Sequence, residues 1–131
     1  MPAKAARVRR IVVPGLTIIP VKPSEAGKSA HIAIERAGNR LTLNMATVPS
    51  FLSICSQMRR ALAAPIALRD GAEFSCLAEG RPYTGYIELR QHPGTDQVSI
   101  WRGSEEVIIL DGWELPALTS VLSALAEELS S

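Results

Sequence analysis

Short stretches of alternating or β-branched apolar residues recur along the chain and predict eight β-strands. In residues 31–36, for example, two isoleucines alternate with polar or small residues, as expected for a strand with one buried face. Two longer stretches have apolar residues at helical spacing, which predicts amphipathic helices at about 47–63 and 115–128. The other seven strands are expected at residues 11–13, 16–21, 40–43, 73–79, 83–90, 97–102 and 106–110.

The order of these elements repeats, since four strands followed by one helix occur twice. Pro49, in the first turn of the first predicted helix, corresponds to Pro116 in the second. The strand at 31–36 corresponds to that at 97–102, and the spacing between these two strands is one residue shorter than the spacing between Pro49 and Pro116. Matching inward positions in the same order of elements favour an internal duplication.

The predicted fold class is α+β: two tandem ββββα repeats forming one pseudo-symmetric body of antiparallel sheets with packed helices. A chain of 131 residues with 47% hydrophobic residues can form one core but is short for two. We therefore expect a single domain over 1–131, with repeat one at about 7–63 and repeat two at about 72–129. Residues 1–6 are expected to be a flexible basic arm.

Charge is divided unevenly between the halves. Residues 1–70 carry eleven Lys/Arg and three Asp/Glu, whereas residues 71–131 carry three Arg and ten acids. Eleven of the fourteen basic residues are arginine, whose planar guanidinium suits phosphate contacts and stacking. Two explanations remain open from the sequence: attraction between oppositely charged halves or subunits, or a basic face for a polyanion.

The outward positions of the predicted strands combine aromatic and arginine side chains. Such a surface is a plausible platform for unstacked bases, with arginines on the phosphates. The alternative is that the aromatic residues Tyr86 and Trp101 fill a subunit interface or cover the core of the other half. The candidate nucleic-acid-binding residues are Arg7, Arg9, Arg10, Arg36, Arg40, Arg81, Tyr86, Arg90, Trp101 and Arg102.

A duplicated ββββα unit resembles the PUR-repeat and Whirly single-stranded nucleic-acid-binding proteins and the related fold of the coactivator PC4. The local similarity is strongest to the PUR repeat, at residues 40–45 (RLTLNM) with Phe51 in the following helix. The second half lacks this junction and has IILDG at 108–112. The lysine-rich motif of plant Whirly proteins is absent. The resemblance implies binding of single-stranded DNA or RNA on a sheet face, by dimers or higher oligomers.

We therefore expect a non-catalytic protein that binds single-stranded nucleic acid, DNA more than RNA, with a role in transcription regulation, replication or recombination. The alternative is a protein-interaction or scaffold module that assembles through sheet edges and its oppositely charged halves. A homo-oligomer is expected in either case.

The sequence offers no catalytic constellation, metal site or cofactor motif, so we expect neither enzymatic activity nor a bound cofactor. Cys55 and Cys76 stand alone at apolar positions and predict buried free thiols in a reducing compartment. No apolar run approaches the length of a membrane span, and we expect a cytoplasmic protein of a bacterium or a virus-infected cell, without a membrane partner. An organelle is the alternative location, because residues 1–10 are basic and free of acids, as in a degenerate transit peptide.

Overall fold

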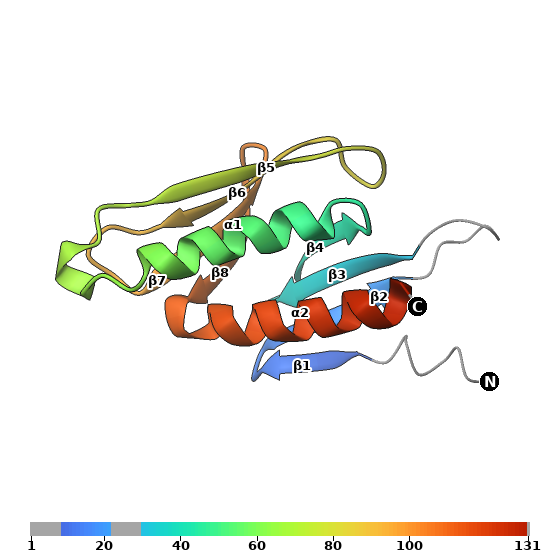
Figure 1. The fold of residues 1–131 in the computed structure, drawn as a ribbon, viewed down its shortest axis with the longest axis horizontal. Helices are drawn as coiled ribbons and strands as arrows, with labels where there is room; N and C mark the ends of the chain where they lie inside the picture. Colours follow the sequence, from blue (N-terminus) through green and yellow to red (C-terminus); the bar gives the residue numbers. More distant parts are fainter. Residues whose placement is uncertain (1–8, 22–29, 131) are drawn as a thin grey trace.

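The structure, a computed structural model, describes residues 9–21 and 30–130 and has two four-stranded antiparallel sheets and two helices (Figure 1). The expected basic arm at 1–6, and Arg7, lie outside the described residues. Strand order in each sheet follows the chain. The first half contains β1 (Arg10–Val13), β2 (Leu16–Val21), β3 (His31–Arg36), β4 (Asn39–Asn44) and α1 (Val48–Ala61). After the 3-10 helix η2 (Ile66–Leu68), the second half contains β5 (Glu73–Ala78), β6 (Gly85–Gln91), β7 (Gln97–Arg102), β8 (Glu105–Asp111), the 3-10 helix η3 (Gly112–Glu114) and α2 (Leu115–Ser130).

The α+β class and the ββββα order of both halves are confirmed, and all eight strands are present. The inward positions are also as predicted, because Ile32, Ile34, Val98 and Ile100 are fully buried. Strand β6 begins at Gly85, two residues later than predicted. Gly85 has φ of +146°, and Tyr83 lies so close to it that an added Cβ would clash with the phenol oxygen.

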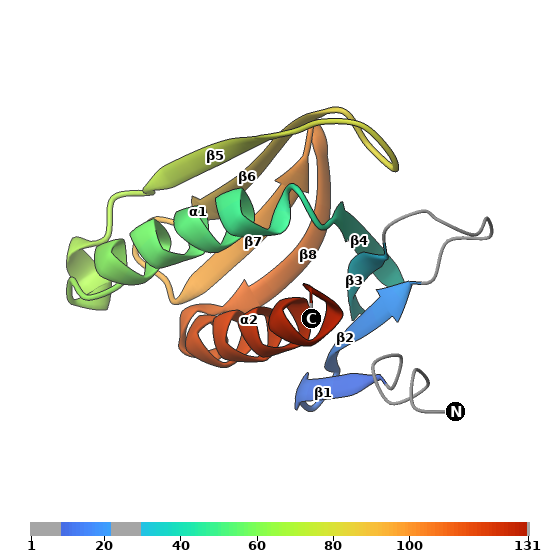
Figure 2. The ribbon, with the colours of Figure 1, turned by 45° about the vertical axis from the view of Figure 1, so that its right-hand side comes forward.

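Each helix packs mainly on the sheet of the other half. Helix α1 contacts β5 and β6, whereas α2 contacts β1 and β2, and the two helices lie side by side (Figures 1 and 2). Buried side chains from both halves consequently form one hydrophobic cluster. The inward face of each sheet is covered only when the other half is present, so the two halves depend on each other for burial.

Backbone geometry explains why the two halves match at two different offsets. In the first half, Ile34 pairs with Leu41 and Glu35 with Arg40. In the second half the corresponding ladder is irregular, with Ile100 opposite Ile108 and Trp101 opposite Glu106. The residue between them, Val107, is thus an insertion in β8, and such an extra residue is a β-bulge. After the bulge, Ile108 and Leu110 point into the core.

At each strand-to-helix junction, a side chain at the end of the strand accepts hydrogen bonds from the residue three positions later. Asn44 Oδ1 accepts the Thr47 N–H and hydroxyl, both at 2.9 Å. At the equivalent place in the second half, Asp111 and Glu114 form a reciprocal capping box. Thr47 occupies the N-cap position of α1, but its side chain makes no cap hydrogen bond and is held by Asn44.

Ion pairs join the basic first half to the acidic second half. Arg36 pairs with Glu114, Arg10 with Glu128 at 2.6 Å, and Arg69 with Asp96 at 2.7 Å. Attraction between oppositely charged halves therefore operates inside the fold, which was one of the two explanations left open by the sequence. Neither helix in the described part of the chain is both long and apolar enough to cross a bilayer.

Candidate nucleic-acid interface

The outward face of the second sheet carries exposed aromatic and apolar side chains. Leu77 on β5 lies directly opposite Tyr86 on β6, and their exposed fractions are 48% and 63%. Glu88 lies opposite Trp101 on β7, and Ile109 on β8 is 42% exposed. Because α1 covers the other side of this sheet, these residues form a face on which no helix within the described residues packs.

Trp101 is half-buried and held in place by polar neighbours. Its indole N–H donates to Ser99 Oγ at 2.9 Å, and the Arg90 guanidinium stacks on its ring at 4.0 Å from the centroid. Ser99 also lies 3.2 Å from His92 Nε2 and is fully buried beneath these side chains. A buried serine cannot attack a substrate in solvent, so this cluster positions the indole rather than presenting a nucleophile.

The structure thus brings three of the predicted residues together, Tyr86, Arg90 and Trp101, on one face. The other predicted arginines are dispersed. Arg9 and Arg40 are on the outward face of the first sheet, where both pair with Glu35. These two guanidiniums, Arg40 first, hold the pKa of the Glu35 carboxyl below its ordinary value.

Most of the predicted arginines already have a carboxylate partner. Arg90 pairs with Glu88, Arg102 with Glu105, and Arg10 with Glu128. Arg81, in the turn between β5 and β6, is exposed, and its guanidinium has no ion pair with any described residue. Exposed pairs contribute little to stability, so phosphate can replace their carboxylates at small cost.

Arg36 differs from the others because its partner is buried. Its terminal nitrogens both donate to Glu114, whose side chain is 5% exposed, and it also donates to the carbonyl of Ile109. Hydrogen bonding to Glu114 raises the pKa of the Arg36 guanidinium, and the same bond lowers the pKa of the Glu114 carboxyl. Releasing Arg36 would leave a buried carboxylate without a partner, so Arg36 acts in the fold.

Carboxylates also lie on the candidate face. Glu73 pairs in register with Arg90, Glu88 with Trp101, and Trp101 with Glu106. The face therefore has aromatic and apolar area with mixed charge, and is less basic than the count of arginines predicts. No group of three or more His, Cys, Asp or Glu residues within 9–21 and 30–130 is arranged to hold a metal ion.

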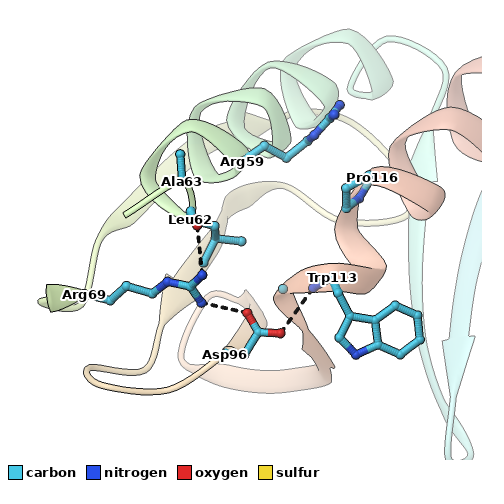
Figure 3. Close-up of a pocket in the computed structure, with 8 residues that line it drawn as sticks. Arg59, Leu62, Ala63, Arg69, Asp96, Trp113 and Pro116 are labelled. Atoms are coloured by element: carbon cyan, nitrogen blue, oxygen red, sulfur yellow. Dashed lines mark hydrogen bonds and ion pairs between the residues drawn. The ribbon is translucent and has the colours of Figure 1, made fainter. Parts of the chain in front are cut away.

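A second candidate site, which is concave, was missed by the sequence analysis. A cavity of about 350 Å³ lies between the end of α1 and the start of α2 (Figure 3). Its lining includes Arg59, Leu62, Trp113 and Pro116, and Trp113 is 63% exposed. One signal could have found it: in the duplicated halves Trp113 stands where the first half has Ala46, so the fold itself does not need an aromatic residue there.

The cysteines are free, as expected. Cys55 is buried in α1, and Cys76 is partly buried on β5. Burial, followed by the proximity of Cys76, raises the pKa of the Cys55 thiol to about 12. Neither thiol is therefore suited to act as a nucleophile near neutral pH.

No known family model matches the chain, and the search of curated proteins found no match either.

Proposed function

We propose that the protein binds single-stranded nucleic acid, DNA or RNA, on the outward face of the second sheet. The observation that carries the proposal is the Arg90 guanidinium stacked on Trp101 at 4.0 Å, on the same face as Tyr86, which is 63% exposed. Bases stack on such aromatic side chains irrespective of sequence, contributing about 1–3 kcal/mol per base. The duplicated ββββα architecture is also the one that the resemblance to PUR-repeat and Whirly proteins implies.

Contacts to the phosphate backbone of the nucleic acid would come from arginines that can exchange a carboxylate partner for a phosphate. Arg90 and Arg102 are in ion pairs with exposed or half-exposed carboxylates, and Arg81 has no such partner among the described residues. Arg36 and Arg10 are excluded from this role, because both connect one half of the fold to the other. The phosphate contacts are thus fewer than the sequence predicts, and the salt dependence of binding should be correspondingly shallow.

The test is fluorescence anisotropy of a labelled single strand of ~30 nucleotides, long enough to occupy one or two sites, at low and moderate salt. The matching duplex is the control. The proposal requires binding that prefers the single strand and weakens as salt rises. Equal affinity for single strand and duplex, or no binding of DNA or RNA at low salt, would contradict it.

A protein partner on the same face is the second candidate. It is favoured by the exposed apolar residues Leu77 and Ile109, and by Glu73 and Glu106, which repel phosphate. A second copy of the chain would be one such partner. Sedimentation that shows a dimer disrupted by Leu77→Glu, together with no binding of nucleic acid, would support this reading over the first.

A further inference from the structure

The cavity between the two helices has the composition of a ligand site. Its volume of about 350 Å³ is at the lower end of the range typical of small-molecule pockets. In Figure 3, Pro116 lies between Arg59, from α1, and Trp113, from η3. Leu62 and Ala63 add apolar wall. The cavity thus combines an open aromatic face, apolar contacts and a cationic group.

The floor of this cavity is held together by hydrogen bonds and an ion pair. Arg69 donates to the carbonyls of Leu62 and Ala64 and to Asp96, so its guanidinium is occupied by the fold. Asp96 in turn accepts the N–H of Trp113 at 3.3 Å. The backbone also approaches closely here, because a Cβ on Gly112 would lie 2.6 Å from Asp96 Oδ1. These contacts fix the backbone position of Trp113. A binding site whose backbone is already held in place loses less conformational entropy when a ligand binds.

Arg59 is the free charge of the cavity. Its guanidinium makes no hydrogen bond or ion pair with any residue in the described part of the chain, and it is exposed. The charges of Arg69 and Asp96 compensate each other at 2.7 Å, so Arg59 leaves the lining with a net positive charge. An anion is therefore the complementary ligand.

We propose that this cavity binds a compact anion that joins an aromatic ring to a phosphate, with the ring on Trp113 and the phosphate on Arg59. Two sources share this chemistry: a free mononucleotide, and the 5′-phosphorylated end of a strand. The site is separate from the face of Tyr86 and Trp101, so it does not depend on the function proposed above.

The test is calorimetric titration of the full chain with adenosine 5′-monophosphate, and with adenosine and inorganic phosphate as separate probes. Tryptophan fluorescence is followed in parallel. Trp113→Leu and Arg59→Gln should each weaken binding of the nucleotide by about tenfold or more, since stacking and the charge contact both contribute. Arg60→Gln is the matched control, because Arg60 is an exposed neighbour outside the cavity lining. Thermal unfolding of each variant checks that the fold is kept.

A thymidine dinucleotide, with and without a 5′-phosphate, separates the two sources. Binding of adenosine 5′-monophosphate that depends on Trp113 and Arg59 supports a free nucleotide as ligand. Binding of the phosphorylated dinucleotide alone, with the same dependence, supports a strand end. The proposal is overturned if neither adenosine 5′-monophosphate nor the phosphorylated dinucleotide binds. It is also overturned if their binding is unchanged in both Trp113→Leu and Arg59→Gln. Loss of strand binding in Tyr86→Ala would not affect either result.

Discussion

Arg36 donates two hydrogen bonds of 2.7 Å to the carboxylate of Glu114, one from each terminal nitrogen of its guanidinium. Arg36 ends β3 in the first half, whereas Glu114 lies in η3, which leads into α2 in the second half. Glu114 also accepts the N–H of Asp111 at 2.8 Å. One carboxylate therefore both caps a helix start and joins the two halves.

Glu114→Ala should destabilise the protein by about 3 kcal/mol, because it leaves the partly buried Arg36 charge without its partner. Chemical denaturation gives the free energy of unfolding. Glu105→Ala is the matched control, since Glu105 is exposed and its pair with Arg102 should contribute less than about 1 kcal/mol. Similar losses in both variants would contradict the structural role given to Arg36.

The same pair should make stability depend on pH. The pKa of Glu114 is lowered in the fold, chiefly by hydrogen bonding to Arg36, from an ordinary value of 4.5. Its contribution is thus complete above about pH 4.5 and is lost as the pH falls through the lower folded value. Glu114→Gln should therefore show a shallower loss of stability than the parent protein below that pH. Parallel curves for both proteins would rule this contribution out.

Neither half should fold alone, because each helix covers the sheet of the other half. Fragments 1–70 and 71–131, expressed separately, are expected to give unfolded or aggregated chains by circular dichroism. Mixing them should restore the β and α signals, since both inward sheet faces are then buried. A cooperative thermal transition in either isolated fragment would show that this half does not need the helix of the other half to cover its sheet.

Arg69→Lys should destabilise the fold even though the charge is kept. Arg69 is 10% exposed and donates to two carbonyls near the end of α1, to Thr95 and to Asp96. A lysine ammonium cannot reproduce this planar set of donors, and we expect a loss of about 2 kcal/mol in thermal or chemical denaturation. Arg60→Lys, at an exposed site, should be neutral within about 0.5 kcal/mol.

Cys55 should resist alkylation in the folded protein. Burial raises the pKa of its thiol to about 12, so the thiolate is scarce at pH 8. Mass spectrometry after iodoacetamide treatment should find Cys76 modified first, because it is only partly buried, and Cys55 only when denaturant is present. Equal labelling of both thiols under native conditions would show that Cys55 is not buried in the folded protein.

Tyr86→Ala should weaken binding of a single strand by about tenfold without loss of stability, since Tyr86 is exposed and a base would stack on its ring. Arg90→Gln should also weaken binding and reduce the slope of affinity against salt. Anisotropy measures both effects. Leu68→Ala is the control, because Leu68 is 73% exposed but lies on η2, outside the candidate face. An equal effect of Leu68→Ala would show that Tyr86 has no specific role.

Local patterns in the sequence determined the strands, the helices and the residues that face the core. Period-two alternation places Ile32 and Ile34 on one side of β3 whatever the rest of the chain does, and the prediction for these residues was correct for that reason. The bulge at Val107 is also visible in the sequence, because the spacing between equivalent residues of the two halves increases by one residue at this point.

Only the tertiary structure decided which surfaces meet. Periodicity identifies the apolar face of α1 but not the sheet that it covers, and that sheet belongs to the other half. It likewise cannot assign partners to arginines, because charges distant in the chain are paired by the packing of the halves. Arg36 therefore lies against Glu114 instead of solvent, and Trp113 and Arg59 line one cavity although 54 positions separate them (113 − 59).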